Sequence, residues 1–141
     1  MGTFVRKRRA CAEERIMDQK PLVLLVDDQE DVRSTLSTIL EFYDFRVEEA
    51  SDGYQAIEKA GQLSPAIVLL DIGMPGIDGF ETARRLRTTS AVPVIAVTAF
   101  GLPGYEERAK EAGFDSFLVK PVLPEALVAE IRRLIAPKSA S

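Results

Sequence analysis

The stretch "IVLLDIGMPGIDGF", Ile67 to Phe80, decides the fold of this chain. Its first four residues are apolar, as in a strand that is buried on both faces of a parallel sheet. Asp71 follows that strand directly, and "GMPG" comes next, a sequence that neither helix nor strand favours. A charge at the end of the most apolar strand, followed by a stiff loop, indicates a binding site at the edge of the sheet.

Apolar runs and amphipathic stretches alternate on both sides of this segment. Strands are expected at 22–28, 46–51, 66–72, 92–99 and 116–120, and helices at 32–43, 53–63, 80–88, 104–113 and 123–136. Gly113 is placed to end one helix and Pro124 to begin the last. Five strand–helix units joined by right-handed crossovers predict an α/β fold, a parallel sheet between two layers of helices.

Length and charge suggest one folded domain with a different kind of segment at each end. The chain has 141 residues, of which 46% are hydrophobic and 28% charged, and no apolar run approaches the roughly 18 residues of a membrane helix. We expect residues 1–20, with net charge +3, to be a basic disordered extension, 21–136 to be the domain, and 137–141 to be a flexible tail. Because residues beyond 20 carry net charge −7, we expect no nucleic-acid partner. Because no apolar run is long enough to span a bilayer, we expect no membrane partner.

Two residue types restrict the possible chemistry. The chain has no histidine, which excludes zinc–histidine sites and catalysis by Ser–His or Cys–His pairs on this chain. Its single cysteine, Cys11, cannot form an internal disulfide, which agrees with a reducing compartment. We therefore expect a cytoplasmic protein.

Polar residues follow four of the five expected strands at their carboxyl ends, where an open parallel sheet binds its ligands. They are Asp27 and Asp28 after the first strand, Asp71 after the third, Thr98 at the end of the fourth and Lys120 at the end of the fifth. Each has an ordinary alternative explanation; Asp28, for example, could cap the helix that starts near Glu30. The combination is far more specific than any single residue.

Three converging carboxylates without histidine or cysteine form a site of hard oxygen ligands, which suits Mg²⁺. Without a partner, the three negative charges would repel, and each carboxylate would raise the pKa of the others. A divalent cation and the Lys120 ammonium would offset this repulsion. The chemistry that this implies is attack of an aspartate on phosphorus, which forms an acyl phosphate.

The segments "VDDQED", "LLDIGMPGIDGFE", "VIAVTA" and "GFDSFLVKPV" resemble the receiver domain of two-component response regulators, over about Pro21 to Ala136. The resemblance implies a flavodoxin-like (βα)5 sandwich with strand order 2-1-3-4-5 and a cis Lys120–Pro121 peptide bond. It also implies Asp71 as phosphoacceptor, Asp27, Asp28, Asp71 and the Gly73 backbone carbonyl as Mg²⁺ ligands, Thr98 and Lys120 as phosphoryl contacts, and Thr98 and Phe117 as switch residues.

Two positions depart from the family pattern. Gly73, two residues after Asp71, has no side chain to reach a phosphoryl group, and Phe100, two after Thr98, cannot orient a water. Because these positions tune hydrolysis in the family, the rate of phosphoryl loss stays open. Gly73 and Gly76 suit close backbone approach and unusual dihedral angles, and Pro75 stiffens the loop.

The resemblance implies a signalling module that accepts a phosphoryl group on Asp71 from a histidine kinase or phosphotransfer protein and then changes conformation. Its chemistry would be limited to Mg²⁺-dependent self-phosphorylation from donors and autodephosphorylation. A downstream protein target would meet the face made by the helix at 104–113, the strand at 116–120 and the last helix.

Two alternatives remain to this interpretation. No output domain follows Ala136, so the leading expectation is a stand-alone receiver, but a receiver excised from a hybrid histidine kinase would look the same. A Mg²⁺-dependent phosphatase with an aspartate nucleophile, of the haloacid-dehalogenase type, is the other alternative. Those enzymes usually carry an acid two residues after the nucleophile, where this chain has Gly73.

Overall fold

The computed structural model describes residues 20–99 and 101–136. The expected N-terminal extension up to residue 19, the tail at 137–141 and Phe100 lie outside the described residues. Every expected strand and helix is present, with ends that differ by a few residues. The elements are β1 (Leu22–Val26), α2 (Glu30–Phe42), β2 (Arg46–Ala50), α3 (Gly53–Leu63), β3 (Ile67–Leu70), α4 (Gly79–Thr89), β4 (Val94–Thr98), α5 (Tyr105–Ala112), β5 (Ser116–Val119) and α6 (Pro124–Ile135).

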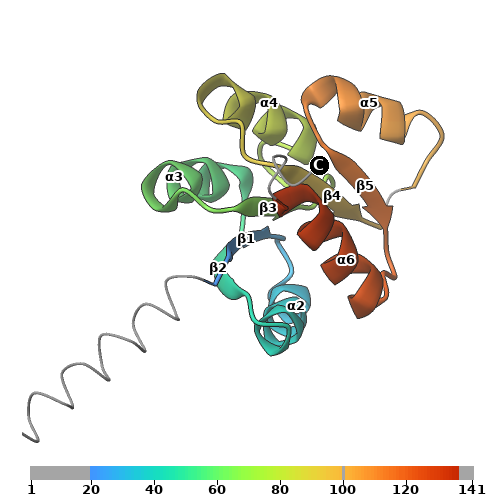
Figure 1. Ribbon diagram of the computed structural model, residues 1–141. Coiled ribbons are helices and arrows are strands. Elements are labelled where there is room, and N and C mark those ends of the chain that lie inside the picture. Colours follow the sequence, from blue (N-terminus) through green and yellow to red (C-terminus); the bar gives the residue numbers. More distant parts are fainter. Residues whose placement is uncertain (1–19, 100, 137–141) are drawn as a thin grey trace, which may run out of the picture.

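The five strands form one parallel sheet in the order β2-β1-β3-β4-β5, which confirms the predicted topology. Helices α2 and α6 cover one face of the sheet, and α3, α4 and α5 cover the other (Figure 1). Strands β1, β3 and β4 lie inside the sheet and are buried almost throughout, whereas β2 and β5 form its edges.

Two apolar cores lie on the two faces of the sheet. In the central strands, successive residues belong to opposite cores, because side chains alternate along a strand. Leu24 and Leu70 pack into the core beneath α3, α4 and α5, and Val23 and Leu69 into the core beneath α2 and α6. Since both faces are covered, apolar residues are needed at every position, which explains the absence of polar alternation in the sequence.

Local signals set several helix ends. Gly113 ends α5 with φ 104°, in the left-handed region, and Pro124 stands in the first turn of α6, both as predicted. Asp78 caps α4, since its Oδ1 accepts a hydrogen bond from the Glu81 amide over 2.9 Å. The alternative role of Asp28 as a helix cap is wrong: the N-cap of α2 is Gln29, without a side-chain cap bond.

Helix α5 is attached to the rest of the domain through few apolar side chains. It buries the side chains of Ala109 and Ala112, both small, and its other attachment is aromatic. Tyr105 meets Phe80 of α4 edge to face at 5.8 Å, and the Arg108 guanidinium lies 4.2 Å from the centre of the Phe80 ring. Small residues bury little apolar area, so this helix is held by few contacts.

No helix within 20–99 and 101–136 is long and apolar enough to span a bilayer.

Candidate functional site

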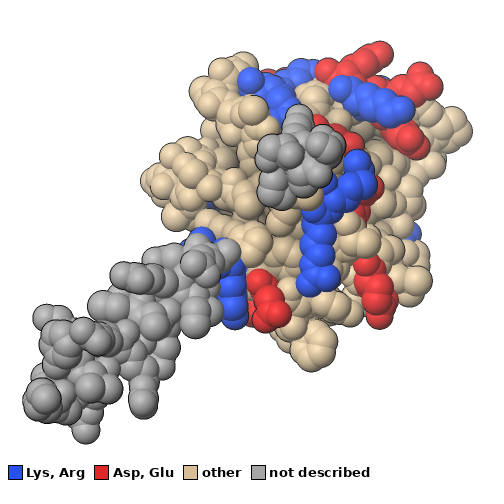
Figure 2. Space-filling view, viewed as in Figure 1, with Lys and Arg blue, Asp and Glu red and all other residues tan. Residues whose placement is uncertain are grey.

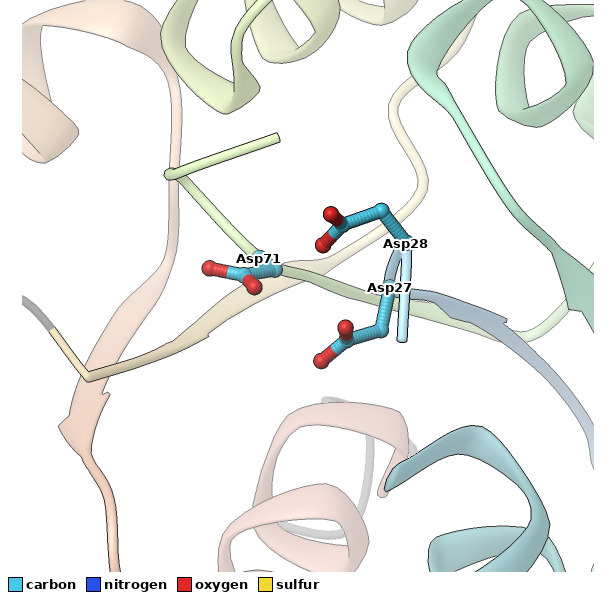
Figure 3. A group of neighbouring side chains, drawn as sticks. All are labelled: Asp27, Asp28 and Asp71. Atoms are coloured by element: carbon cyan, nitrogen blue, oxygen red, sulfur yellow. The ribbon is translucent and has the colours of Figure 1, made fainter. Parts of the chain in front are cut away.

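Three carboxylates gather at the carboxyl edge of the sheet. Asp27 and Asp28 follow β1, and Asp71 follows the neighbouring strand β3. One oxygen of each lies within 4.8 Å of the others, and Figure 3 shows all three side chains reaching to the same side of the two strands. Asp27 and Asp71 are buried, whereas Asp28 is exposed. The structure thus brings the three predicted acids together.

The pairing of Asp27 with Asp28 needs a change of backbone direction, since consecutive side chains of a strand point to opposite faces. The Asp27 amide still donates to the Ala50 carbonyl at 3.2 Å, as the last step of the strand ladder. Beyond it the chain turns, and the Asp27 Oδ1 accepts a hydrogen bond from the Gln29 amide over 2.9 Å. The turn lets both carboxylates reach the same space.

Lys120 brings a positive charge to the cluster from the end of β5. Its ammonium donates to Asp27 Oδ2 over 2.8 Å and lies 3.9 Å from Asp71 Oδ2. The Lys120 amide also donates to the Thr98 carbonyl at 2.8 Å, which ties the two strand ends together. The Lys120–Pro121 peptide bond is cis, as predicted.

Burial raises the pKa of Asp71 above the ordinary value of 3.8, because a charged carboxylate loses hydration there. The negative charge of Asp27 acts in the same direction. The Gly73 amide, 3.1 Å from Asp71 Oδ1, the Lys120 charge and the Thr98 hydroxyl lower the pKa, but they do not outweigh burial. A poorly hydrated carboxylate of this kind gains from any further cation placed beside it.

The loop after Asp71 requires glycine at two positions, of which the sequence predicted one. Gly76 has φ 81°, in the left-handed region, as the loop interpretation expected. Gly79, at the start of α4, escaped the sequence reasoning. A Cβ there would lie 2.6 Å from both the Asp71 carbonyl oxygen and the Ile72 Cα, so α4 can begin this close to the site because the side chain is absent. The repeated glycine in "GIDGFE" was the available signal.

The two expected switch residues lie on one face of adjoining strands. Thr98 is fully buried at the end of β4, and its hydroxyl hydrogen-bonds to Asp71. Phe117 of β5 is half-buried, lies beside Ala96 in the strand register, and packs against the core beneath α3, α4 and α5. Phe117 also lines a hollow of about 280 Å³ between α5 and α6, with Lys110 and Glu130 on its walls.

Sequence comparison places the chain among known signalling proteins. The family model described as "Response regulator receiver domain" matches residues 23–132. The transcriptional regulatory protein ResD of Bacillus subtilis is 36% identical over 121 residues, which covers 84% of this chain and 50% of ResD. The probable transcriptional regulator ycf27 of Guillardia theta is 38% identical over 119 residues, covering 84% of this chain and 47% of that protein. The chain thus spans about half the length of these curated relatives.

Solved structures agree with the sequence matches. The chemotaxis protein CheY4 of Vibrio cholerae is similar with TM-score 0.77 and 31% identity, over 82% of this chain and 98% of that chain. The BeF3-activated N-terminal receiver domain of Klebsiella pneumoniae RstA is similar with TM-score 0.79 and 27% identity, over 82% of this chain and 99% of the other. Both matches cover more than four fifths of this chain and nearly all of the other chain.

Proposed function

This chain belongs to the response regulator receiver family, and on that premise we propose that Asp71 is its phosphoacceptor. The family membership fits a phosphorylation-activated signalling domain. The observation that carries the assignment to Asp71 is its place in the cluster: it is buried, beside two other carboxylates, and 3.9 Å from the Lys120 ammonium.

The acidic cluster suits Mg²⁺. With the three carboxylates ionised, Lys120 leaves an excess of two negative charges, which one divalent cation would balance. Asp27, Asp28, Asp71 and the Gly73 backbone carbonyl are the proposed ligands, all of them the hard oxygens that this ion prefers. When bound, Mg²⁺ would supply neutralisation of the phosphoryl oxygens during transfer.

The protein's own residues have separate roles in the proposed phosphoryl transfer. An oxygen of Asp71 attacks phosphorus of a phosphohistidine, the bond between phosphorus and the donor imidazole nitrogen breaks, and its electron pair stays on that nitrogen. The Gly73 amide holds Asp71 Oδ1 over 3.1 Å, which orients the carboxylate. Lys120 and the Thr98 hydroxyl lie where they can pair with the oxygens of the transferred group.

The donor must come from another protein, since this chain has no histidine. We propose a histidine kinase or a phosphotransfer protein as the donor, acting in a reducing compartment such as the cytoplasm. For the output we propose a protein that docks on α5, β5 and α6. Figure 2 shows acidic and basic side chains intermixed over α5, which suits a protein partner better than a nucleic-acid backbone. No specific observation favours the phosphatase or the hybrid-kinase alternative.

The test is incubation of the full chain with acetyl phosphate and Mg²⁺, followed by intact-mass analysis. We expect one added phosphoryl group in the wild type and in Asp78→Asn, and none in Asp71→Asn. Asp78 is a matched control, because it is an aspartate of the same loop that caps α4. Uptake of the group by Asp71→Asn, or its absence in Asp78→Asn, would contradict the assignment.

A further inference from the structure

The orientation of the Asp27–Asp28 peptide determines whether both carboxylates can face Asp71. A strand continued through Asp28 would place its carboxylate on the opposite face of the sheet from Asp27. The orientation of this peptide is set by where its carbonyl, that of Asp27, finds a hydrogen-bond donor. Strand β1 has already ended at Val26, so the sheet ladder does not supply one.

The donor is Arg33 of α2. Its Nη1 donates to the Asp27 carbonyl over 2.7 Å, a short bond from a charged group. The Arg33 side chain is only 15% exposed, so little water competes for that carbonyl.

Glu49 orients the guanidinium of Arg33. Arg33 Nε donates to Glu49 Oε1 over 3.1 Å, and the Ser37 hydroxyl donates to Glu49 Oε2 over 3.1 Å. Glu49 belongs to β2, the strand beside β1, and Ser37 belongs to α2, so the contact joins two elements that flank the site. Because a guanidinium is planar with fixed donor directions, holding Nε at Glu49 fixes where Nη1 points.

We propose that Arg33, oriented by Glu49, is a positioning residue that turns the Asp27–Asp28 peptide so that both carboxylates face Asp71 and can share one divalent cation. The inference rests on the proposed function, since it concerns the affinity of that site for Mg²⁺. Residues that orient metal ligands from outside typically change metal affinity 10- to 100-fold when removed.

Electrostatics alone makes the opposite prediction. Arg33 is a positive charge near three carboxylates, so its removal should strengthen the binding of a cation if charge were its whole effect. If Arg33 positions the acids, its removal weakens binding despite the lost repulsion. The sign of the change therefore separates the two roles.

The experiment is calorimetric titration of the full chain with MgCl₂, at a temperature where circular dichroism shows every variant folded. We expect Arg33→Met to weaken Mg²⁺ binding by about 10- to 100-fold. Arg33→Lys should fall between it and the wild type, because one ammonium cannot serve Asp27 and Glu49 in the same fixed geometry. Should Arg33→Met fail to fold, Arg33→Gln, with a shorter polar side chain, takes its place with the same expected result.

The matched control is Arg46→Met. Arg46 Nε also donates to a backbone carbonyl, that of Lys20 over 3.0 Å, but at the opposite end of the sheet. We expect its Mg²⁺ affinity to equal that of the wild type. Binding by Arg33→Met that is as tight as in the wild type, or tighter, overturns the inference and leaves the proposed function standing.

A second readout does not need the metal. In ¹⁵N–¹H spectra of the metal-free protein, the amide signals of Asp28 and Gln29 should move in Arg33→Met and stay in place in Arg46→Met. If the wild type binds no Mg²⁺, the proposed metal site fails, and the positioning role is then decided by these two signals alone. Unmoved signals in Arg33→Met would overturn it.

Discussion

Lys120 and Asp27 stand 93 positions apart in the chain, yet the Lys120 ammonium donates a hydrogen bond to Asp27 Oδ2 over 2.8 Å. The Asp27 side chain is 3% exposed, and that of Lys120 is 24% exposed. The pair spans the ends of β1 and β5, on opposite sides of the strand that carries Asp71. The Lys120 ammonium therefore already lies at the proposed phosphorylation site. It is held there by Asp27, which is also a proposed metal ligand.

Lys120→Met should lower the free energy of unfolding by about 1–3 kcal/mol in the absence of Mg²⁺, because it leaves Asp27 buried without its partner. Mg²⁺ should restore part of the loss, since it binds the folded state. Thermal unfolding with and without Mg²⁺ measures both effects. Lys110→Met, on the exposed side of α5, is the control and should change stability by at most about 0.5 kcal/mol. Equal stability of Lys120→Met and the wild type would contradict the pairing.

Asp71→Asn should stabilise the metal-free protein at neutral pH. The folded-state pKa of Asp71 is raised, so its charged form costs stability at every pH above that raised value. The gain should shrink as pH falls through the raised pKa, and it should vanish below the ordinary value of 3.8. Urea unfolding across this pH range tests the prediction. A variant less stable than the wild type at neutral pH, or a gain independent of pH, would show that burial is not the dominant effect.

Gly79→Ala and Gly61→Ala should change stability in opposite directions. At Gly79 the new Cβ meets the Asp71 carbonyl and the Ile72 Cα at 2.6 Å, and since these are backbone atoms we expect a loss of about 1–3 kcal/mol. At Gly61, inside α3, the Cβ meets nothing within 4 Å, and we expect a gain of about 0.5–1 kcal/mol. Chemical denaturation measures both. A neutral Gly79→Ala would mean that α4 can move away from Asp71 at little cost.

Phosphorylation should be transmitted from Thr98 towards α5 and β5. Thr98 is already buried, and its hydroxyl is hydrogen-bonded to Asp71. A phosphoryl group on Asp71 can therefore accept a hydrogen bond from this hydroxyl without a large movement of Thr98. Helix α5 has few apolar contacts and should shift most easily, with Phe117 beneath it. We expect beryllium fluoride with Mg²⁺ to change amide signals across residues 105–120 of the wild type.

The same titration of two threonine variants supplies the control. Thr98→Val should confine the signal changes to the neighbourhood of the three aspartates. Thr38→Val, on the exposed side of α2 where the hydroxyl bonds to the Ser34 carbonyl, should behave as the wild type. Changes that never reach residues 105–120 in the wild type would refute this route.

The fold was predictable from sequence because burial on two faces leaves a strong local pattern. The uninterrupted apolar residues of β1, β3 and β4 follow from helices covering both sides of the sheet. The strand order is a different matter. The alternation of strands and helices predicted a parallel sheet, but the order β2-β1-β3-β4-β5 came from family resemblance, because periodicity does not say which strands are neighbours.

The sequence by itself determined which acids could meet. Asp27, Asp28 and Asp71 follow parallel strands, and the carboxyl ends of such strands share one edge. Only the tertiary structure decided how they meet. Arg33 donates a hydrogen bond to the Asp27 carbonyl, and Gly79 lies so close to the backbone of Asp71 and Ile72 that a Cβ at this position would clash with it. Such contacts depend on how separate elements pack. Because every residue type has the same backbone carbonyl, no local sequence pattern shows which carbonyl will be contacted.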